Sequence, residues 1–327
     1  MELINTEKRQ GMSVIVPFLN EEEGLPLFCR TLDEFAGTLA FPLELVFVND
    51  GSTDRSAEVV EAYPFQQLSH VRLVNLSKNF GSHAAIRAGL TQASFDICLW
   101  IGSDLQEPLE IIPRGFELIR QGYDAVYVEK KTVQVSKANR LFSRIYSHLM
   151  QKYAVKSYSS GGVSTIVFNG KIKQYLNDNI ETNSSIMLQI LDAGFRSTTL
   201  SLDFHERAAG VSKWTLAKKI KLFIDSFVAF SFMPIRLVSM IGVLIFLIGV
   251  IIGLVVIVNR FVNPQVPSGY STLASILALG FGVTNISLGI IAEYLWRAYD
   301  SARGRPCFLI SEVVNLDSNR GDGHEGK

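Results

Sequence analysis

The sequence predicts an α/β protein with a parallel sheet covered by helices on both faces, followed by two membrane-spanning helices. Between residues 13 and 130, short apolar runs rich in β-branched residues alternate with longer stretches of helical periodicity. Further along, Leu237 to Val258 is an apolar run without a charged residue. Because about 20 such residues cross a bilayer, this run predicts a membrane span.

Five strands are predicted in the first part of the chain, and a helix follows each of the first four. The strands are SVIVPF at 13–18, LELVFVND at 43–50, VRLVNLS at 71–77, ICLWIGSD at 97–104 and DAVYVEK at 124–130; the helices lie at 22–35, 56–63, 82–91 and 109–121. Such alternation is typical of parallel sheets, because a parallel connection needs a long crossover. The next segment predicts a helix at 138–153, a turn at Gly161 and Gly162, and a strand at 164–168.

Polar residues follow the first four predicted strands. They are Asn20 and Glu21, Asn49 to Ser52, Ser77 to Asn79, and Ser103 to Gln106. Ligands of such sheets gather beyond the carboxyl ends of the strands, so these residues predict one binding crevice. The sequence has no glycine-rich dinucleotide fingerprint after the first strand, no P-loop motif and no zinc spacing.

A second apolar run, Leu273 to Ala292, is also long enough to span a membrane, and an amphipathic helix at 214–232 is expected to lie in the headgroup layer. Basic residues flank the two runs: Lys213, Lys218, Lys219, Lys221 and Arg236 come before them, and Arg297, Arg303 and Arg305 come after. The connecting loop carries Arg260 alone, so both ends are expected in the cytoplasm. The alternative is a pair of buried core helices.

The predicted domains are therefore a cytoplasmic domain at 1–212, a juxtamembrane helix at 213–235, two spans at 236–296 and a cytoplasmic tail at 297–327. The N-terminus lacks the apolar core of a signal peptide. The chain has 327 residues, 48% of them apolar, and a formal net charge of zero, which argues against a nucleic-acid partner and against disorder. Three scattered cysteines favour a reducing compartment.

Six ordered blocks of the sequence resemble the polyisoprenyl-phosphate glycosyltransferases of the inverting family 2. The blocks are SVIVPFLNEEEGL, LVFVNDGSTDRS, LSKNFGSHAAIRAGL, SDLQEPLEIIP, RAAGVSKW and EYLWRAYDSARGRPCFLI. The family includes relatives of dolichyl-phosphate mannose synthase and bacterial undecaprenyl-phosphate glucosyltransferases. The resemblance implies a cytoplasmic GT-A domain at the cell membrane. This domain moves a sugar, taken to be a hexose, from a nucleotide donor to a lipid phosphate for cell-surface glycan modification.

The first three blocks are expected to bind the nucleotide, with a UDP-sugar favoured as donor. Pro17 and Glu21 end the first strand, and Asp50, followed by Ser52, ends the second, where a carboxylate can accept a hydrogen bond from a pyrimidine base. Lys78 and Asn79 would approach the ribose or the diphosphate. The alternatives are a simple turn that caps the next helix, and a solvated lysine. His83, on the first turn of the next helix, is a minor candidate.

The fourth block departs from the family pattern. Asp-x-Asp-x-Gln is usual there, around a divalent cation, whereas this sequence has Gly102, Asp104 and Gln106. Mg²⁺ or Mn²⁺ is still expected at Asp104 and Gln106, because one carboxylate plus substrate phosphates can hold Mg²⁺. The alternative is that Asp104 only caps the helix after Pro108.

The acceptor side also departs from the family, with Gly162, Val163 and Ser164 in place of a Gly-Asp-Phe-Arg motif. A phosphate monoester is mostly dianionic at pH 7 and serves as its own nucleophile, so it needs cations rather than a general base. Arg207 and Lys213 match the family's basic motif and would grip this phosphate, unless they are ordinary positive-inside charge.

Two other functions remain open. One is direct transfer of a sugar to a growing glycan, although no Gln-x-x-Arg-Trp motif follows Gly162. The other is a non-catalytic membrane subunit that keeps the fold, which the missing carboxylate at Gly102 favours. Small residues in the spans, such as Gly242 and Gly289, permit close helix packing and hence a homo-oligomer.

Overall fold

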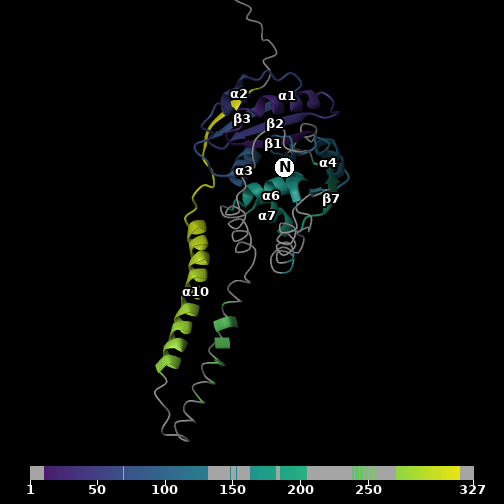
Figure 1. The fold of residues 1–327 in the computed structure, drawn as a ribbon. Helices are drawn as coiled ribbons and strands as arrows, with labels where there is room; N and C mark the ends of the chain where they lie inside the picture. Colours follow the sequence, from purple (N-terminus) through teal and green to yellow (C-terminus); the bar gives the residue numbers. More distant parts are fainter. Residues whose placement is uncertain are drawn as a thin grey trace, which may run out of the picture. The chain divides into compact units, whose positions relative to one another are not determined.

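The computed structural model describes residues 11–68, 70–131, 163–181, 185–204 and 270–316, with isolated positions at 148, 152 and between 238 and 254. The chain divides into two compact units, one of residues 1–222 and 306–327 and the other of residues 223–305. The first unit holds the sheet, and the second holds the helix α10 (Tyr270–Ala302) (Figure 1).

The first unit is built on a mixed sheet of eight described strands in the order β7-β5-β6-β4-β1-β2-β3-β8. The strands are β1 (Met12–Phe18), β2 (Leu43–Asn49), β3 (His70–Leu76), β4 (Ile97–Trp100), β5 (Ala125–Lys130), β6 (Val163–Phe168), β7 (Ser197–Leu202) and β8 (Ile310–Asn315). β1 pairs in parallel with β2 and with β4, and β2 pairs in parallel with β3. The first four predicted strands are therefore confirmed as a parallel core.

The prediction of a wholly parallel sheet is wrong at two places. β6 lies antiparallel between β4 and β5, so the fifth predicted strand does not neighbour the fourth. β8 comes from the segment predicted as a tail and pairs antiparallel with β3. Both strands satisfy backbone hydrogen bonds along strands that would otherwise be edges, a non-local effect that strand periodicity does not reveal.

Four helices agree with the predicted ranges to within three residues at each end: α1 (Leu25–Ala36), α2 (Ser56–Ala62), α3 (Ser82–Gln92) and α4 (Ile111–Arg120). Two further helices, α6 (Gly170–Asp178) and α7 (Ile186–Asp192), were not predicted. The side chain of Asn169 caps α6 by accepting hydrogen bonds from the amides of Lys171 and Ile172. The predicted helices at 138–153 and 214–232 lie outside the described ranges.

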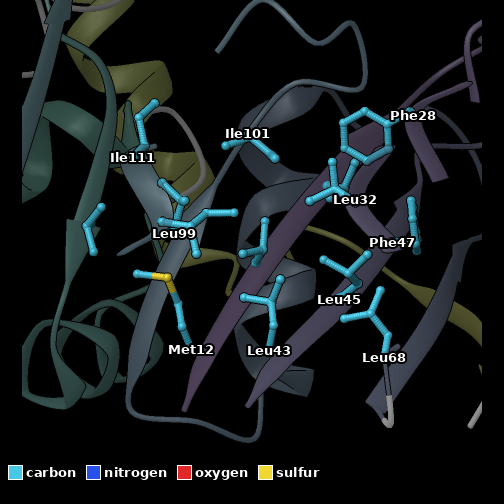
Figure 2. Close-up of a cluster of buried hydrophobic side chains, with 14 of the residues drawn as sticks. Met12, Phe28, Leu32, Leu43, Leu45, Phe47, Leu68, Leu99, Ile101 and Ile111 are labelled. Atoms are coloured by element: carbon cyan, nitrogen blue, oxygen red, sulfur yellow. The ribbon is translucent and has the colours of Figure 1, made fainter. Parts of the chain in front are cut away.

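The parallel strands are buried on both faces, as a sheet covered by two helical layers requires. Met12, Leu45 and Leu99 belong to a buried cluster with Phe28 and Leu32 of α1 (Figure 2). Fully burying one such side chain contributes about 2–3 kcal/mol, so this cluster fixes α1 over the sheet.

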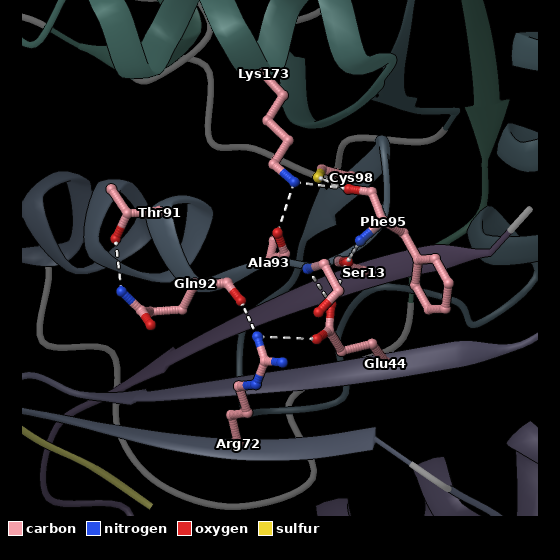
Figure 3. Close-up of polar contacts among 10 residues, drawn as sticks. Ser13, Glu44, Arg72, Thr91, Gln92, Ala93, Phe95, Cys98 and Lys173 are labelled. Carbon is pink, nitrogen blue, oxygen red and sulfur yellow. Dashed lines mark hydrogen bonds and ion pairs between the residues drawn. The ribbon is translucent and has the colours of Figure 1, made fainter. Parts of the chain in front are cut away.

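A polar network joins the amino-terminal ends of β1, β2 and β3, away from the polar strand ends (Figure 3). Glu44 is fully buried; its Oε2 accepts hydrogen bonds from Ser13 Oγ at 2.5 Å and from the Ser94 amide at 2.7 Å. Its Oε1 forms an ion pair with Arg72 Nη1 at 3.4 Å, without the geometry of a hydrogen bond. The network ties the loop before β4 to β2 and so holds the register of the parallel core.

We expect Glu44→Gln to lower the free energy of unfolding by about 2 kcal/mol, because charge-assisted hydrogen bonds become neutral ones and the Arg72 guanidinium keeps its bond to the Gln92 carbonyl but loses its ion-pair partner. Urea unfolding of the detergent-solubilised protein measures this change. The matched control is Glu58→Gln, which removes an exposed ion pair with Arg55 and should cost less than about 0.5 kcal/mol. Equal losses in the two variants would contradict a stabilising role for the buried network.

The second unit is described chiefly by α10, which contains the predicted second span. Among the described residues, no helix combines the length and the apolar character needed for crossing a membrane. The first predicted span falls outside the described ranges, apart from isolated positions.

Candidate functional site

The loops after β1 and β2 are interlocked at the carboxyl edge of the sheet. Asn20, with a φ of +52°, donates its amide to Ser52 Oγ at 3.0 Å and accepts the amide of Thr53 on its side-chain oxygen at 2.8 Å. The amide of Glu21 donates to Ser56 Oγ at 2.8 Å. Each of the two loops supplies hydrogen-bond partners to the other, so Glu21 and Ser52 are held together at the carboxyl edge of the sheet. We call these two interlocked loops the rim.

Asp50 joins the end of β2 to the loop after β3. Asp50 is 4% exposed, and its two carboxylate oxygens accept hydrogen bonds from the backbone amides of Phe80 at 2.7 Å and Gly81 at 3.0 Å. Burial raises the pKa of this carboxyl, and the two backbone amides offset part of that rise. Neither Asp50 nor Ser52 caps α2, whose first turn instead donates the Ser56 amide to Asp54. The alternative reading of this stretch as a helix cap is therefore wrong.

A pocket of about 280 Å³ opens beside Asp50. It is lined by Pro17, Phe18, Leu19, Asp50, Asn79, Gly81 and Ser82. Three of the six predicted nucleotide-binding residues, Pro17, Asp50 and Asn79, therefore share one cavity. Its volume is at the small end of ligand pockets and suits one flat heterocycle rather than a whole nucleotide sugar.

The other three predicted nucleotide-binding residues are not among those that line this pocket. Glu21 and Ser52 lie in the rim described above. Lys78 is exposed, and its ammonium lies 5.1 Å from the centroid of the Phe80 ring. The cation therefore belongs to the same loop as Asn79 and Gly81, which line the pocket.

The chain makes a strained turn shortly after the carboxyl end of β4. Leu105 has a φ of +55°, which a residue with a side chain seldom adopts, and the Gln106 amide donates to Asp104 Oδ1 at 3.3 Å. α4 starts at Ile111 with Glu110 at its N-cap position, so Asp104 is not the cap of that helix. Strain of this kind gathers at functional sites, which favours a binding role for this turn.

Glu107 also belongs to this turn. The sequence pattern predicted only Asp104 and Gln106 as metal ligands and did not identify Glu107. Its Oε2 is buried without a hydrogen-bond partner. Burial raises the pKa of Glu107, and the nearby Asp104 carboxylate adds to that rise. The acidic residue directly after Gln106 was the available signal, but sequence spacing does not tell which way its side chain turns.

The chemistry of this turn fits a hard cation, although it does not form a complete protein cage. Two carboxylates and one amide are the oxygen donors that Mg²⁺ and Mn²⁺ prefer. Within the described ranges, no cluster of three or more histidine, cysteine, aspartate or glutamate side chains is arranged to hold a metal ion. The donor diphosphate would have to supply the remaining ligands.

His83, the minor candidate, lies on the first turn of α3 with its Nδ1 buried and without a hydrogen-bond partner. Burial holds the pKa of the imidazole below its ordinary value of 6.5, and the guanidinium of Arg87 lowers it further. His83 is therefore a neutral, packed side chain at pH 7 rather than a cation for the diphosphate.

The depressed pKa of His83 predicts that stability falls as the pH drops below about 6.5. In that range the unfolded chain binds a proton at residue 83 more readily than the native protein does, so protonation favours unfolding. We expect His83→Gln to flatten the dependence, measured by urea unfolding at about pH 5 and about pH 7. His70→Gln serves as control, and parallel curves for His83→Gln and the wild type would refute this expectation.

The predicted acceptor residues, Arg207 and Lys213, lie outside the described ranges, as do Gly161 and Gly162. Val163 and Ser164 begin β6, where Val163 pairs with Glu129 of β5.

The match to a family model shows that the α/β sheet and its helices form a glycosyltransferase fold of the GT-A class. The sequence profile of glycosyl transferase family 2 matches residues 13–187. The chain belongs to this family.

The relatives that match over nearly the full length include two proteins named undecaprenyl-phosphate 4-deoxy-4-formamido-L-arabinose transferase. The protein from Yersinia enterocolitica is 31% identical, with 95% of this chain and 96% of the relative covered. The protein from Photorhabdus laumondii is 31% identical, with 98% of each chain covered. Among solved structures, glucosyl-3-phosphoglycerate synthase from Mycobacterium tuberculosis, in complex with Mn²⁺, UDP and phosphoglyceric acid, has a TM-score of 0.46 at 14% identity, covering 67% of this chain and 76% of that one.

Proposed function

We propose that the protein transfers a sugar from a nucleotide-diphosphate donor to undecaprenyl phosphate. The observation that carries this proposal is the match to the two named transferases, which extends over at least 95% of this chain. It includes the segments that follow the family 2 region, so the similarity is not limited to a donor-binding fold that many transferases share.

The nucleotide base is proposed to enter the pocket beside Asp50, with Pro17 and Asn79 on its walls. The Asp50 oxygens already accept two amides but retain lone pairs for a base N–H. Pyrimidine N–H groups match this acceptor, which supports a UDP-sugar. Glu21, Ser52 and Lys78 are proposed to hold the rim and to approach the ribose or the diphosphate.

Asp104 and Gln106 are proposed to hold Mg²⁺ or Mn²⁺ against the donor diphosphate. When bound, the cation neutralises negative charge that builds up on the departing nucleoside diphosphate. Asp104 supplies the carboxylate, and the turn at Leu105 keeps Gln106 beside it.

The lipid phosphate is proposed to attack the anomeric carbon directly. One of its oxygens forms the new bond while the bond to the donor diphosphate breaks, and the nucleoside diphosphate leaves with the electron pair, which inverts the anomeric centre. No proton has to be removed, because the monoester is mostly dianionic at pH 7. Arg207 and Lys213 are proposed to hold this phosphate by charge-assisted hydrogen bonds.

The sugar is proposed to be a pentose derivative rather than the hexose that the resemblance implied. Both relatives are named for a 4-deoxy-4-formamido-L-arabinose, and arabinose is a pentose. A pentose lacks the exocyclic hydroxymethyl group of a hexose, so the sugar subsite would be smaller.

The second unit is proposed to hold the enzyme at the cytoplasmic face of the cell membrane through two spans within residues 236–296. The charge-free run at 237–258 supports the first span. Exposed apolar side chains along α10 support contact with lipid, among them Phe281 at 68%, Ile286 at 62% and Leu295 at 66% exposure. Resistance of the protein to alkaline extraction from membranes would test this attachment.

The proposed function is tested by incubating the full chain in proteoliposomes with undecaprenyl phosphate, Mg²⁺ or Mn²⁺, and a panel of UDP-linked pentoses and hexoses. We expect a glycolipid from a UDP-pentose derivative. A product on a soluble glycan instead of the lipid would favour direct glycan transfer. Nucleotide binding without any product would favour the non-catalytic subunit.

A further inference from the structure

Gly102, just after the carboxyl end of β4, leaves a space that two carboxylates approach. A Cβ atom added to Gly102 would lie 3.2 Å from Asp104 Oδ1 and 3.5 Å from Glu107 Oε2. Leu105, whose backbone is left-handed, lies between these two residues in the sequence. The chain bends there, so that the side chains of Asp104 and Glu107 both reach Gly102. The place where a side chain of residue 102 would begin is therefore flanked by the oxygens of Asp104 and Glu107.

The Glu107 oxygen that reaches this space has no hydrogen-bond partner, and it is buried. Buried carboxylate oxygens are normally paired, because an unpaired one costs its full desolvation free energy. The Glu107 carboxyl interacts with the backbone amides of Glu107 and Gly102 and lies near Lys130, but none of these groups bonds to Oε2. The Lys130 ammonium lies instead 4.7 Å from the centroid of the Phe204 ring. A divalent cation between the two carboxylates would give the orphaned oxygen a partner. It would also offset the repulsion between Glu107 and Asp104.

We propose that Glu107 supplies the second metal-binding carboxylate of this site, in the place left by Gly102. The inference rests on the proposed function, since the cation is the one that would hold the donor diphosphate. Glutamate carries one methylene more than aspartate, and that extra length lets a residue beyond Gln106 reach back to residue 102. The departure at Gly102 is then an exchange of carboxylates rather than a loss.

The test measures Mn²⁺ affinity of the full chain in detergent with UDP present, by electron paramagnetic resonance of free Mn²⁺. We expect Glu107→Gln to raise the Mn²⁺ dissociation constant by about tenfold or more, because a charged ligand becomes a weak neutral one. The matched control is Glu110→Gln, whose exposed carboxylate is 4.0 Å from Arg114 on the following helix. This control should leave the Mn²⁺ affinity unchanged.

The double variant Gly102→Asp with Glu107→Gln separates metal binding from a purely structural role. It returns a carboxylate to the space beside Asp104, so we expect it to recover most of the Mn²⁺ affinity lost in Glu107→Gln. Without metal, Glu107→Gln should melt no lower than the wild type, since it removes a charge whose buried Oε2 has no partner and keeps a side-chain oxygen that can accept the backbone amides. The increase in melting temperature caused by Mn²⁺ should shrink in the same variant.

Unchanged Mn²⁺ affinity in Glu107→Gln would overturn the inference. A loss of affinity that comes with a lower metal-free melting temperature and is not restored by the double variant would overturn it as well. Failure of the proposed function looks different: a wild type that binds Mn²⁺ through Glu107 but makes no glycolipid refutes the function alone. Glycolipid formed in excess chelator by a wild type that binds no Mn²⁺ refutes the inference alone.

Discussion

Replacing Asp104 by asparagine is expected to lower the rate of glycolipid formation by about a thousandfold. The change removes the carboxylate proposed to hold the cation at the donor diphosphate, and charge stabilisation of the leaving group is usually the largest catalytic contribution in such a site. Asparagine keeps a side-chain oxygen that can accept the Gln106 amide, so the turn should survive. The measurement is the initial rate of glycolipid formation in proteoliposomes at saturating donor.

The matched control is Asp192→Asn, which removes an exposed carboxylate from α7 and should leave the rate unchanged. Both variants are compared by melting temperature, so that a loss of rate is not confused with a loss of fold. If Asp104→Asn keeps more than about a tenth of the wild-type rate, Asp104 does not hold the cation in the reaction.

Replacing Gly51 by alanine is expected to lower the free energy of unfolding by about 4 kcal/mol and to abolish tight UDP binding. Gly51 has a φ of +70°, and a Cβ there would lie 2.5 Å from the Lys78 carbonyl carbon and 2.6 Å from the Asn79 nitrogen. These contacts are with backbone atoms, so the loop after β3 must move, and the strained φ adds its own cost. That movement would also displace the Phe80 and Gly81 amides from Asp50.

Gly194→Ala isolates the cost of the backbone angle. Gly194 has a φ of +72°, but no atom within 4 Å would meet an added Cβ. Its substitution should therefore cost only about 1 kcal/mol and leave UDP affinity as in the wild type. Urea unfolding and a UDP titration of both variants provide the comparison. Similar losses at the two glycines would mean that the contact of Gly51 with the β3 loop is not important for the pocket.

The donor side of the site was largely predictable. Neighbouring parallel strands place their carboxyl ends at one edge, so the polar residues after β1 and β2 had to meet once the strand order was right. Pro17, Asp50 and Asn79 do line one pocket. What the pattern did not reveal is that both Asp50 oxygens are also engaged by backbone amides, because such bonds depend on the path of a loop from another strand.

Glu107 shows why the metal side was harder to predict. Its neighbours Asp104 and Gln106 were assigned because their spacing matches a family pattern, whereas the glutamate just outside that pattern was a signal without a direction, because spacing does not tell which way its side chain turns. The role proposed for Glu107 depends on the left-handed turn at Leu105 and on the space beside Gly102. A side chain that folds back over a glycine is a property of the local backbone path, which residue types alone do not specify.

The sequence by itself determined the parallel core from β1 to β4 and the helices between its strands. In that region each signal is local: β-branched runs, helical periodicity and short connections lie next to one another in the chain. Only the tertiary structure decided that β6 enters antiparallel beside β4 and that β8, from the far end of the sequence, pairs with β3. The physical reason is that edge pairing is chosen by backbone groups in need of hydrogen-bond partners, and these groups are the same in every sequence.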